Sequence, residues 1–123
     1  MVNEVSTKLL VLSMEMEAYK QQVAAINVAN VNTKGYKPYT VSFTQALNAI
    51  EHSDSNDARE VVIDKLRQSG VEDIAKFDIN HQSGDVMLDE EILASSRASG
   101  RYQTMAELLN RRLGLIRMGI KGQ

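Results

Sequence analysis

Two heptad patterns, one at each end of the chain, limit the fold more than any other feature of the sequence. Towards the N-terminus, apolar residues recur at spacings of three and four: Val2, Val5, Leu9, Leu12, Met16, Tyr19, Val23 and Ile26. A strand would require strict alternation, whereas this spacing places the apolar side chains along one stripe of a helix. We therefore predict a long helix over residues 1–31, buried along this N-terminal seam.

The same helix carries a second, weaker apolar face. Its members are Leu10, Met14, Ala24 and Val28, which lie roughly opposite the seam. A helix that is apolar on two faces buries both of them only if it has more than one neighbour. The sequence thus predicts that a single antiparallel partner does not cover this helix.

The C-terminal part repeats the heptad pattern, and we predict a second long helix over residues 88–121. Its seam is formed by Leu88, Ile92, Ser95, Ser99, Tyr102, Ala106, Leu109, Leu113, Ile116 and Ile120. Acidic residues at its start and basic residues at its end suit the helix dipole. Two terminal helices of similar length are expected to pack together as a coiled-coil-like unit, which makes the fold mostly α.

The middle of the chain, residues 32–87, is expected to form a turn, an extended segment and a mobile loop. The polar stretch 52–60 reads as loop, and residues 61–66 suit a short helix or strand. Alternating apolar and polar residues around Phe77 and Ile79 predict a short strand. Nothing indicates a second domain, so residues 1–123 are treated as one.

The first helix is expected to end sharply at a corner. Asn30 and Asn32 tolerate left-handed backbone, Gly35 supplies a position of positive φ, and Pro38 prevents helix from continuing. After the proline, Tyr39, Val41 and Phe43 fall on one face of an extended segment. These residue types predict a helix that is stopped and followed by a strand or hook.

Composition and charge narrow the classes of function. The chain has no cysteine, which excludes disulfides and thiolate metal sites. We find neither a signal-peptide pattern in residues 1–28 nor an apolar run of membrane-spanning length. Residues 51–91 contain 12 acidic and 4 basic residues, whereas residues 92–123 contain 1 and 6. This division indicates either self-recognition, a charged partner, or solvated faces that simply differ.

No pattern in the sequence supports catalysis or metal binding. His81 has Asp78, Ser83 and Asp85 nearby, but neighbours along a chain seldom converge into a catalytic triad. The spacing of Asp78, Asn80, Gln82 and Asp89 only faintly resembles a calcium loop, because Ser83 replaces the sharp-turn glycine. Phosphate-binding glycine loops are absent. We therefore expect no enzyme activity, no cofactor and no metal.

Nucleic-acid binding is also not expected. Arg111, Arg112, Arg117 and Lys121 form a basic cluster near the end of the C-terminal helix, but they are distributed around the helix. A nucleic-acid surface would gather them on one face and add aromatic stacking platforms. A structural or interaction protein remains.

The stretch "ANVNTKGYKPYTVSF", residues 29–43, resembles the signature of bacterial flagellar axial proteins, the rod, hook and hook-associated family. Members of this family commonly read N-x-A/V-N-T-x-G-Y-K just after their first helix. The positions that match are Asn30, Asn32, Thr33, Gly35, Tyr36 and Phe43, whereas Lys34 stands where proline is usual.

The C-terminal end supports this resemblance. Tyr102 and Gln103 match the family's tyrosine–glutamine pair, and "VMLDEE" is similar to its V-x-L-x-x-E entry into the last helix. The resemblance covers both ends, about half of the chain. Hook and distal-rod proteins insert large β-domains between the terminal helices, and this chain has room only for a loop. Within the family, the resemblance therefore favours a proximal rod protein of the basal body.

The resemblance implies function by assembly. A rod subunit leaves the cytoplasm uncleaved through the flagellar export apparatus, polymerises helically in the periplasmic rod and transmits torque. Its implied partners are copies of itself, other rod subunits, and membrane-ring and export-gate proteins, with no nucleic acid and no small-molecule substrate. The alternative from another class is a cytoplasmic helical adaptor that forms a closed dimer, which heptads at both ends would suit equally.

Overall fold

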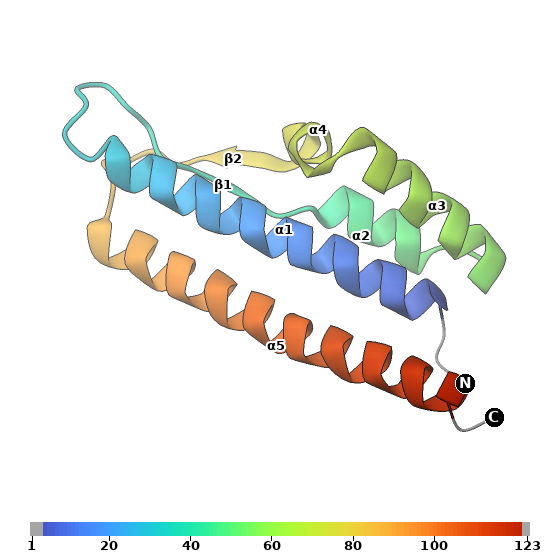
Figure 1. Ribbon diagram of the computed structural model, residues 1–123. Coiled ribbons are helices and arrows are strands. Elements are labelled where there is room, and N and C mark those ends of the chain that lie inside the picture. The colour runs from blue at the N-terminus through green and yellow to red at the C-terminus, as the bar shows by residue number, and fades with distance from the viewer. Residues whose placement is uncertain (1–3, 122–123) are drawn as a thin grey trace.

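Two long helices run antiparallel along the molecule, α1 (Glu4–Ala29) and α5 (Leu88–Lys121) (Figure 1). The computed structural model describes residues 4–121, so Val2 of the N-terminal seam lies outside the described residues, as does the side chain of Ile120. The helices pack against each other along much of their length. The prediction of a mostly helical fold with paired terminal helices is confirmed.

The middle of the chain differs from the expected extended loop, because most of it is helical. After the corner come β1 (Tyr39–Val41), α2 (Thr44–Glu51), α3 (Asn56–Ser69), α4 (Val71–Ala75), a 3-10 turn η1 (Lys76–Asp78) and β2 (Ile79–His81). The polar stretch 52–60 is only partly loop. Its Ser55 side chain accepts a hydrogen bond from the Ala58 amide at 3.1 Å and so caps the start of α3.

The two short strands form an antiparallel pair. Tyr39 lies opposite His81, and Val41 opposite Ile79. A hydrogen bond of 2.8 Å from the Gln82 amide to the Pro38 carbonyl extends the pairing. The ladder therefore ties the corner after α1 to the segment that leads into α5.

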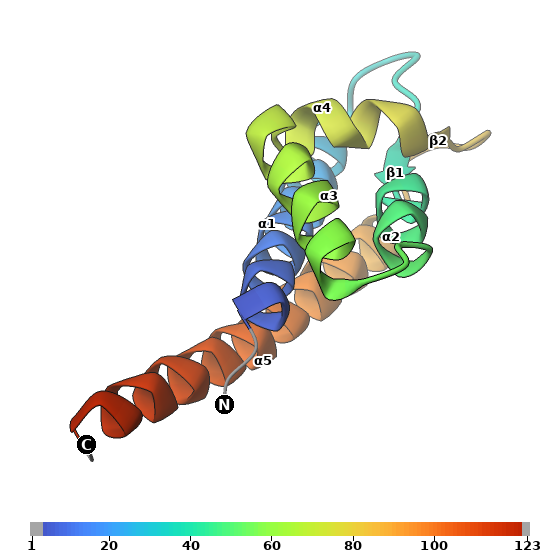
Figure 2. The same cartoon turned by 90° about the vertical axis from the view of Figure 1, so that its right-hand side faces the viewer.

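Helix α1 is the central element, with α5 on one side and the middle segment on the other (Figures 1 and 2). Its seam faces the middle segment: Leu12, Met16 and Val23 are buried in one cluster with Phe43 and other apolar residues, Val41, Ala46, Ile50, Ile63, Ile74 and Ala75. Among residues 4–121, no side chain of α5 belongs to this core. The two predicted seams therefore do not face each other, although the helices that carry them pack together.

The contact between α1 and α5 uses small and charged residues. Ala24 is buried on α1, and Glu91 and Ala98 are buried on α5. This is the second apolar face of α1, so the prediction that α1 needs more than one neighbour is confirmed. Aliphatic side chains of the middle segment cover the seam better than α5 does, because the α5 face contains serine, alanine and glycine.

The last part of α5 projects beyond α1 (Figure 2). With 34 residues against 26, α5 is about 12 Å longer at the usual helical rise. Leu113, Leu115, Ile116 and Met118 lie in or near this projecting part and are all exposed. Within residues 4–121, this end of α5 therefore leaves large apolar side chains exposed.

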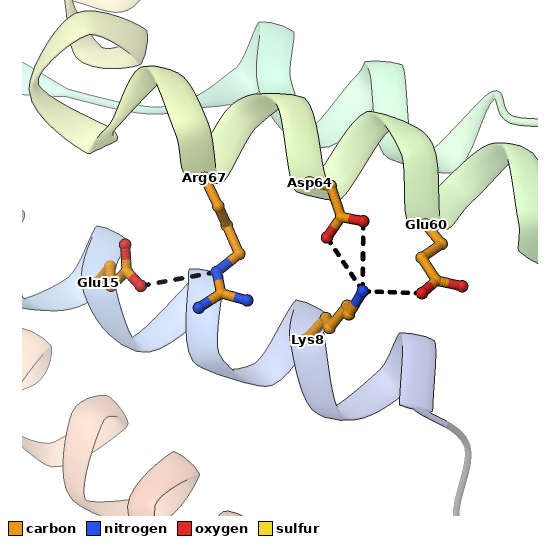
Figure 3. Close-up of polar contacts among 5 residues, drawn as sticks. All are labelled: Lys8, Glu15, Glu60, Asp64 and Arg67. Carbon is orange, nitrogen blue, oxygen red and sulfur yellow. Dashed lines mark hydrogen bonds and ion pairs between the residues drawn. The ribbon is translucent and has the colours of Figure 1, made fainter.

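A polar edge fixes α3 beside the N-terminal half of α1 (Figure 3). The Lys8 ammonium lies 2.7 Å from Glu60 and 3.2 Å from Asp64, and Arg67 lies 4.0 Å from Glu15. These hydrogen bonds to Glu60 and Asp64 raise the pKa of Lys8. Because such partly exposed pairs contribute little to stability, the edge serves mainly to set the register of the two helices.

Candidate assembly surface

The corner after α1 is built around one buried side chain, Asn27. Its side chain is fully buried, and its Nδ2 donates to the Tyr39 carbonyl at 2.9 Å. Its Oδ1 accepts from the Tyr36 hydroxyl at 2.6 Å and from the Tyr39 amide at 3.3 Å. Asn27 thus holds the last turn of α1, the loop and β1 together, because each of its polar groups has a partner.

A second set of hydrogen bonds closes the loop itself. Asn30 Nδ2 donates to the Ile26 carbonyl at 2.8 Å, and the Thr33 hydroxyl donates to Asn30 Oδ1 at 3.1 Å. The Tyr36 amide donates a hydrogen bond to the Thr33 carbonyl at 3.2 Å. Between these two residues Gly35 has φ 79°, the left-handed conformation that the sequence predicts for it.

Phe43 follows the corner and β1 and lies in the core at the start of α2. It is fully buried, and its ring packs edge-on against Tyr19 with centroids 6.1 Å apart. Its φ of 56° is unusual for a residue with a large side chain. The Phe43 carbonyl accepts from the Leu47 amide at 3.0 Å, so this strained residue turns the chain from β1 directly into α2.

The structure brings together four of the six motif residues, Asn30, Thr33, Gly35 and Tyr36, within one folded corner, whereas Phe43 lies in the core against Tyr19. Asn32 is exposed on the outside of the loop, as is Lys34. Sequence reasoning missed Asn27 and the backbone of Tyr39. The available signal was an asparagine inside the apolar last turn of a helix, a place where a polar side chain requires partners.

The predicted C-terminal seam lies mostly on the surface. Tyr102, Leu113 and Ile116 are 39%, 41% and 40% exposed, and Leu109 is half-buried. The predicted N-terminal seam is placed differently, since Leu12, Met16 and Val23 are buried and Leu9, Tyr19 and Ile26 are half-buried. The α5 seam is therefore available to another molecule, whereas the α1 seam is not.

One ion pair links the two long helices across their shared face. Glu17 is 6% exposed, and its carboxylate lies 2.9 Å from Arg101 Nε and 3.5 Å from Lys20 Nζ. A buried carboxylate requires such partners, since leaving it unpaired is strongly unfavourable. Glu17 and Arg101 therefore fix the register of α5 on α1.

The residues considered for chemistry do not converge. The His81 ring packs against Tyr39 in the β ladder, with centroids 5.9 Å apart, and His52 bonds the Asn48 carbonyl of its own helix at 2.8 Å. Within residues 4–121, no group of three or more histidine, aspartate or glutamate side chains is placed to hold a metal ion. In the same range, no helix has both the length and the apolar character needed to cross a membrane.

The chain was compared with protein-family models, curated proteins and solved structures, and none of them matches it.

The backbone of the corner makes Gly35→Val a sharp test. Space is not limiting, because nothing lies within 4 Å of the position where a Cβ would stand. The cost comes from forcing a β-branched residue to φ 79°. We expect the substitution to lower the free energy of unfolding by about 1–3 kcal/mol. Urea unfolding measures this, with Gly35→Asn as the control that tolerates left-handed backbone. If the two variants were equally stable, position 35 would not require a left-handed backbone, and the prediction would be wrong.

Stability is expected to fall as the pH rises past about 10. Burial raises the pKa of Tyr19 and of Tyr36, and nearby Tyr39 adds to both shifts. The unfolded chain loses these protons at lower pH than the folded chain, so the stabilisation is complete below about 10 and disappears above it. Urea unfolding between neutral and alkaline pH measures the loss. Tyr19→Phe/Tyr36→Phe should reduce this loss of stability.

Proposed function

We propose that this chain is a structural subunit of the proximal rod of the bacterial flagellar basal body. Within that class it is of the FlgB type, with the FlgC type as the alternative. The observation that carries the proposal is the Asn-x-Asn-Thr-x-Gly-Tyr corner at the end of a long N-terminal helix, which itself packs beside a long C-terminal helix.

The construction of the corner supports an assembly role. Hydrogen bonds from Asn27 and Asn30 hold the loop from inside, while Asn32 and Lys34 stay on its surface and Val31 is 41% exposed. A loop that is rigid inside and carries exposed polar and apolar side chains is suited to binding a neighbouring subunit with little loss of entropy.

The C-terminal helix supports the same role. Its exposed large apolar side chains are Leu88, Ile92, Leu93, Tyr102, Leu108, Leu113, Leu115, Ile116 and Met118. An isolated soluble chain rarely exposes so much apolar surface on one helix, and such surfaces mark contacts with other proteins. In our proposal these contacts are to copies of the chain, to other rod subunits, and to membrane-ring and export-gate proteins.

The proposed role is mechanical and involves no catalysis, no cofactor, no nucleic acid and no small-molecule substrate. The subunit would leave the cytoplasm through the flagellar export apparatus without cleavage of a signal peptide. It would then polymerise helically in the periplasmic rod through its terminal helices and transmit torque.

Locating the protein in purified basal bodies tests the proposal. An epitope-tagged chain should co-purify with the rod, and deletion of its gene should abolish motility, which the wild-type gene should restore. A cytoplasmic distribution with normal motility would contradict the proposal. In that case a stable, concentration-independent dimer in size-exclusion chromatography would favour the helical adaptor.

A further inference from the structure

Helix α5 and the segment leading into it carry opposite charges at their two ends. Residues 85–91 contain four acidic residues and no basic one: Asp85, Asp89, Glu90 and Glu91. Residues 108–121 contain four basic residues and no acidic one: Arg111, Arg112, Arg117 and Lys121. The helix has 34 residues and is about 50 Å long, so the two groups stand at opposite ends of the molecule (Figure 1).

Exposed apolar side chains gather at the same two ends. Met87, Leu88, Ile92 and Leu93 lie beside the acidic group, and Met87 and Ile92 are 56% and 58% exposed. Leu108, Leu113, Leu115, Ile116 and Met118 lie beside the basic group. Between Ala94 and Glu107, within the described structure, Tyr102 is the one exposed large apolar residue. Each end therefore combines an apolar patch with charge of one sign.

The helix dipole explains part of this arrangement, because it favours acidic residues at the start of a helix and basic residues at its end. It does not explain why large apolar side chains accompany the charges into solvent. In the part of the chain that the structure describes, Asp85, Asp89 and Glu90 form no ion pair. The lysines of the corner, Lys34 and Lys37, do not pair with them either.

The basic end is similar. Within the same described residues, Arg111 and Arg112 form no ion pair, and Arg117 bonds only the Leu113 carbonyl of its own helix, at 3.4 Å. In contrast, Arg101 in the middle of α5 pairs with buried Glu17. Arg101 is thus paired inside the molecule, whereas Asp85, Asp89 and Glu90 at one end and Arg111 and Arg112 at the other are available to a partner; Glu91 is buried against α1 and does not belong to the available acidic surface.

We infer that copies of this chain associate head to tail along α5. The basic, apolar C-terminal end of one copy docks on the acidic, apolar N-terminal end of the next. The apolar patches supply contact area, and the opposite charges select a second copy and set its direction. Because the two surfaces differ, the contact is heterologous and leaves both ends of any oligomer able to add a further copy. This inference rests on the proposed assembly role and assigns which surfaces meet.

Charge reversal of the full-length chain tests the inference. One variant reverses the acidic end, Asp89→Lys/Glu90→Lys, and another reverses the basic end, Arg111→Glu/Arg117→Glu. Sedimentation velocity over a concentration series, at low and high salt, measures self-association. The wild type should associate with concentration and dissociate with added salt. Each reversal should weaken association at least tenfold, whereas Glu51→Lys/Asp54→Lys, an equal charge change on the surface of the middle segment, should not.

Complementation distinguishes docking from a general charge effect. An equimolar mixture of the two reversed chains should associate again, because each end then meets an opposite charge. A single chain that carries both reversals should also recover. Circular dichroism checks the helicity of every variant. If Asp89→Lys/Glu90→Lys lowers the helicity, the neutral pair Asp89→Asn/Glu90→Gln replaces that variant. The association of the neutral pair must then be weaker and less salt-dependent than that of the wild type.

A wild type that stays monomeric at all concentrations would overturn the inference, as would folded variants that do not complement each other. The sedimentation experiments use purified protein, so their outcome does not depend on whether the chain is part of a flagellum. Failure of the flagellar proposal would show as normal motility without the gene, even if head-to-tail association were observed in solution.

Discussion

Asn27→Leu should lower the free energy of unfolding by about 3–5 kcal/mol, the largest stability change expected from any residue of the corner. Leucine has the same branching and the same number of side-chain heavy atoms, so its somewhat larger side chain has a similar shape, and the lost hydrogen bonds are the main change. The substitution instead leaves the Tyr39 amide and carbonyl, both bonded to Asn27, without a partner. Each buried polar group that loses its partner costs about 1–3 kcal/mol, and the Tyr36 hydroxyl loses a bond of 2.6 Å as well.

Urea unfolding followed by circular dichroism measures this loss. Tyr36→Phe is the matched control, because it removes one of the three hydrogen bonds and leaves the backbone of Tyr39 paired. We expect that variant to lose only about 1 kcal/mol. If Asn27→Leu were as stable as the control, the corner would be held by packing alone, and its hydrogen bonds would be incidental.

Ile116→Asp should abolish incorporation into the assembly while leaving the single chain almost as stable as the wild type. Ile116 is 40% exposed in the projecting part of α5, so an aspartate there remains in contact with water in the free chain. In an apolar interface between copies, the same unpaired carboxylate would cost several kcal/mol. A helical polymer repeats that cost at every copy, so we expect no assembly and no motility.

The control for this variant is Val61→Asp on α3. Val61 is 53% exposed but lies outside both the corner and α5, so its substitution should preserve assembly. Urea unfolding of each free chain, together with motility and basal-body incorporation, measures the two effects separately. Normal assembly of Ile116→Asp would show that this end of α5 faces solvent in the assembled state.

The local structure of the corner could be predicted from residue types alone. Gly35 has the positive φ that the turn requires, α1 ends at Ala29 just before Asn30, and Val41 is buried in the short strand after Pro38. These outcomes depend on short-range sterics and on side-chain bonds to nearby backbone, which residue types specify directly. The expectation that Phe43 continues the same extended face is wrong, because its backbone is left-handed, with φ 56°, and leads into α2. Asn27 escaped prediction because its partners lie up to 12 residues away.

The middle segment was predicted less well. Its turn-forming residues, which favoured a loop, instead begin a helix, because Ser55 caps α3 and Ile63 is then fully buried against the α1 side of the core. The composition of a polar stretch is compatible both with a loop and with the start of a helix. Tertiary burial of the apolar residues that follow decides between them.

Heptad spacing alone is enough to predict two long helices and an α1 that requires neighbours on two faces, because it specifies which side chains share a stripe. Which neighbour covers which stripe does not follow from that spacing and depends on how the whole chain packs. The seam of α1 packs on the aliphatic residues of the middle segment, and α5 takes the second face through alanines and the Glu17–Arg101 pair. The physical reason is that a stripe specifies how much apolar surface must be buried, whereas the partner is chosen by a competition among all elements of the chain for that surface.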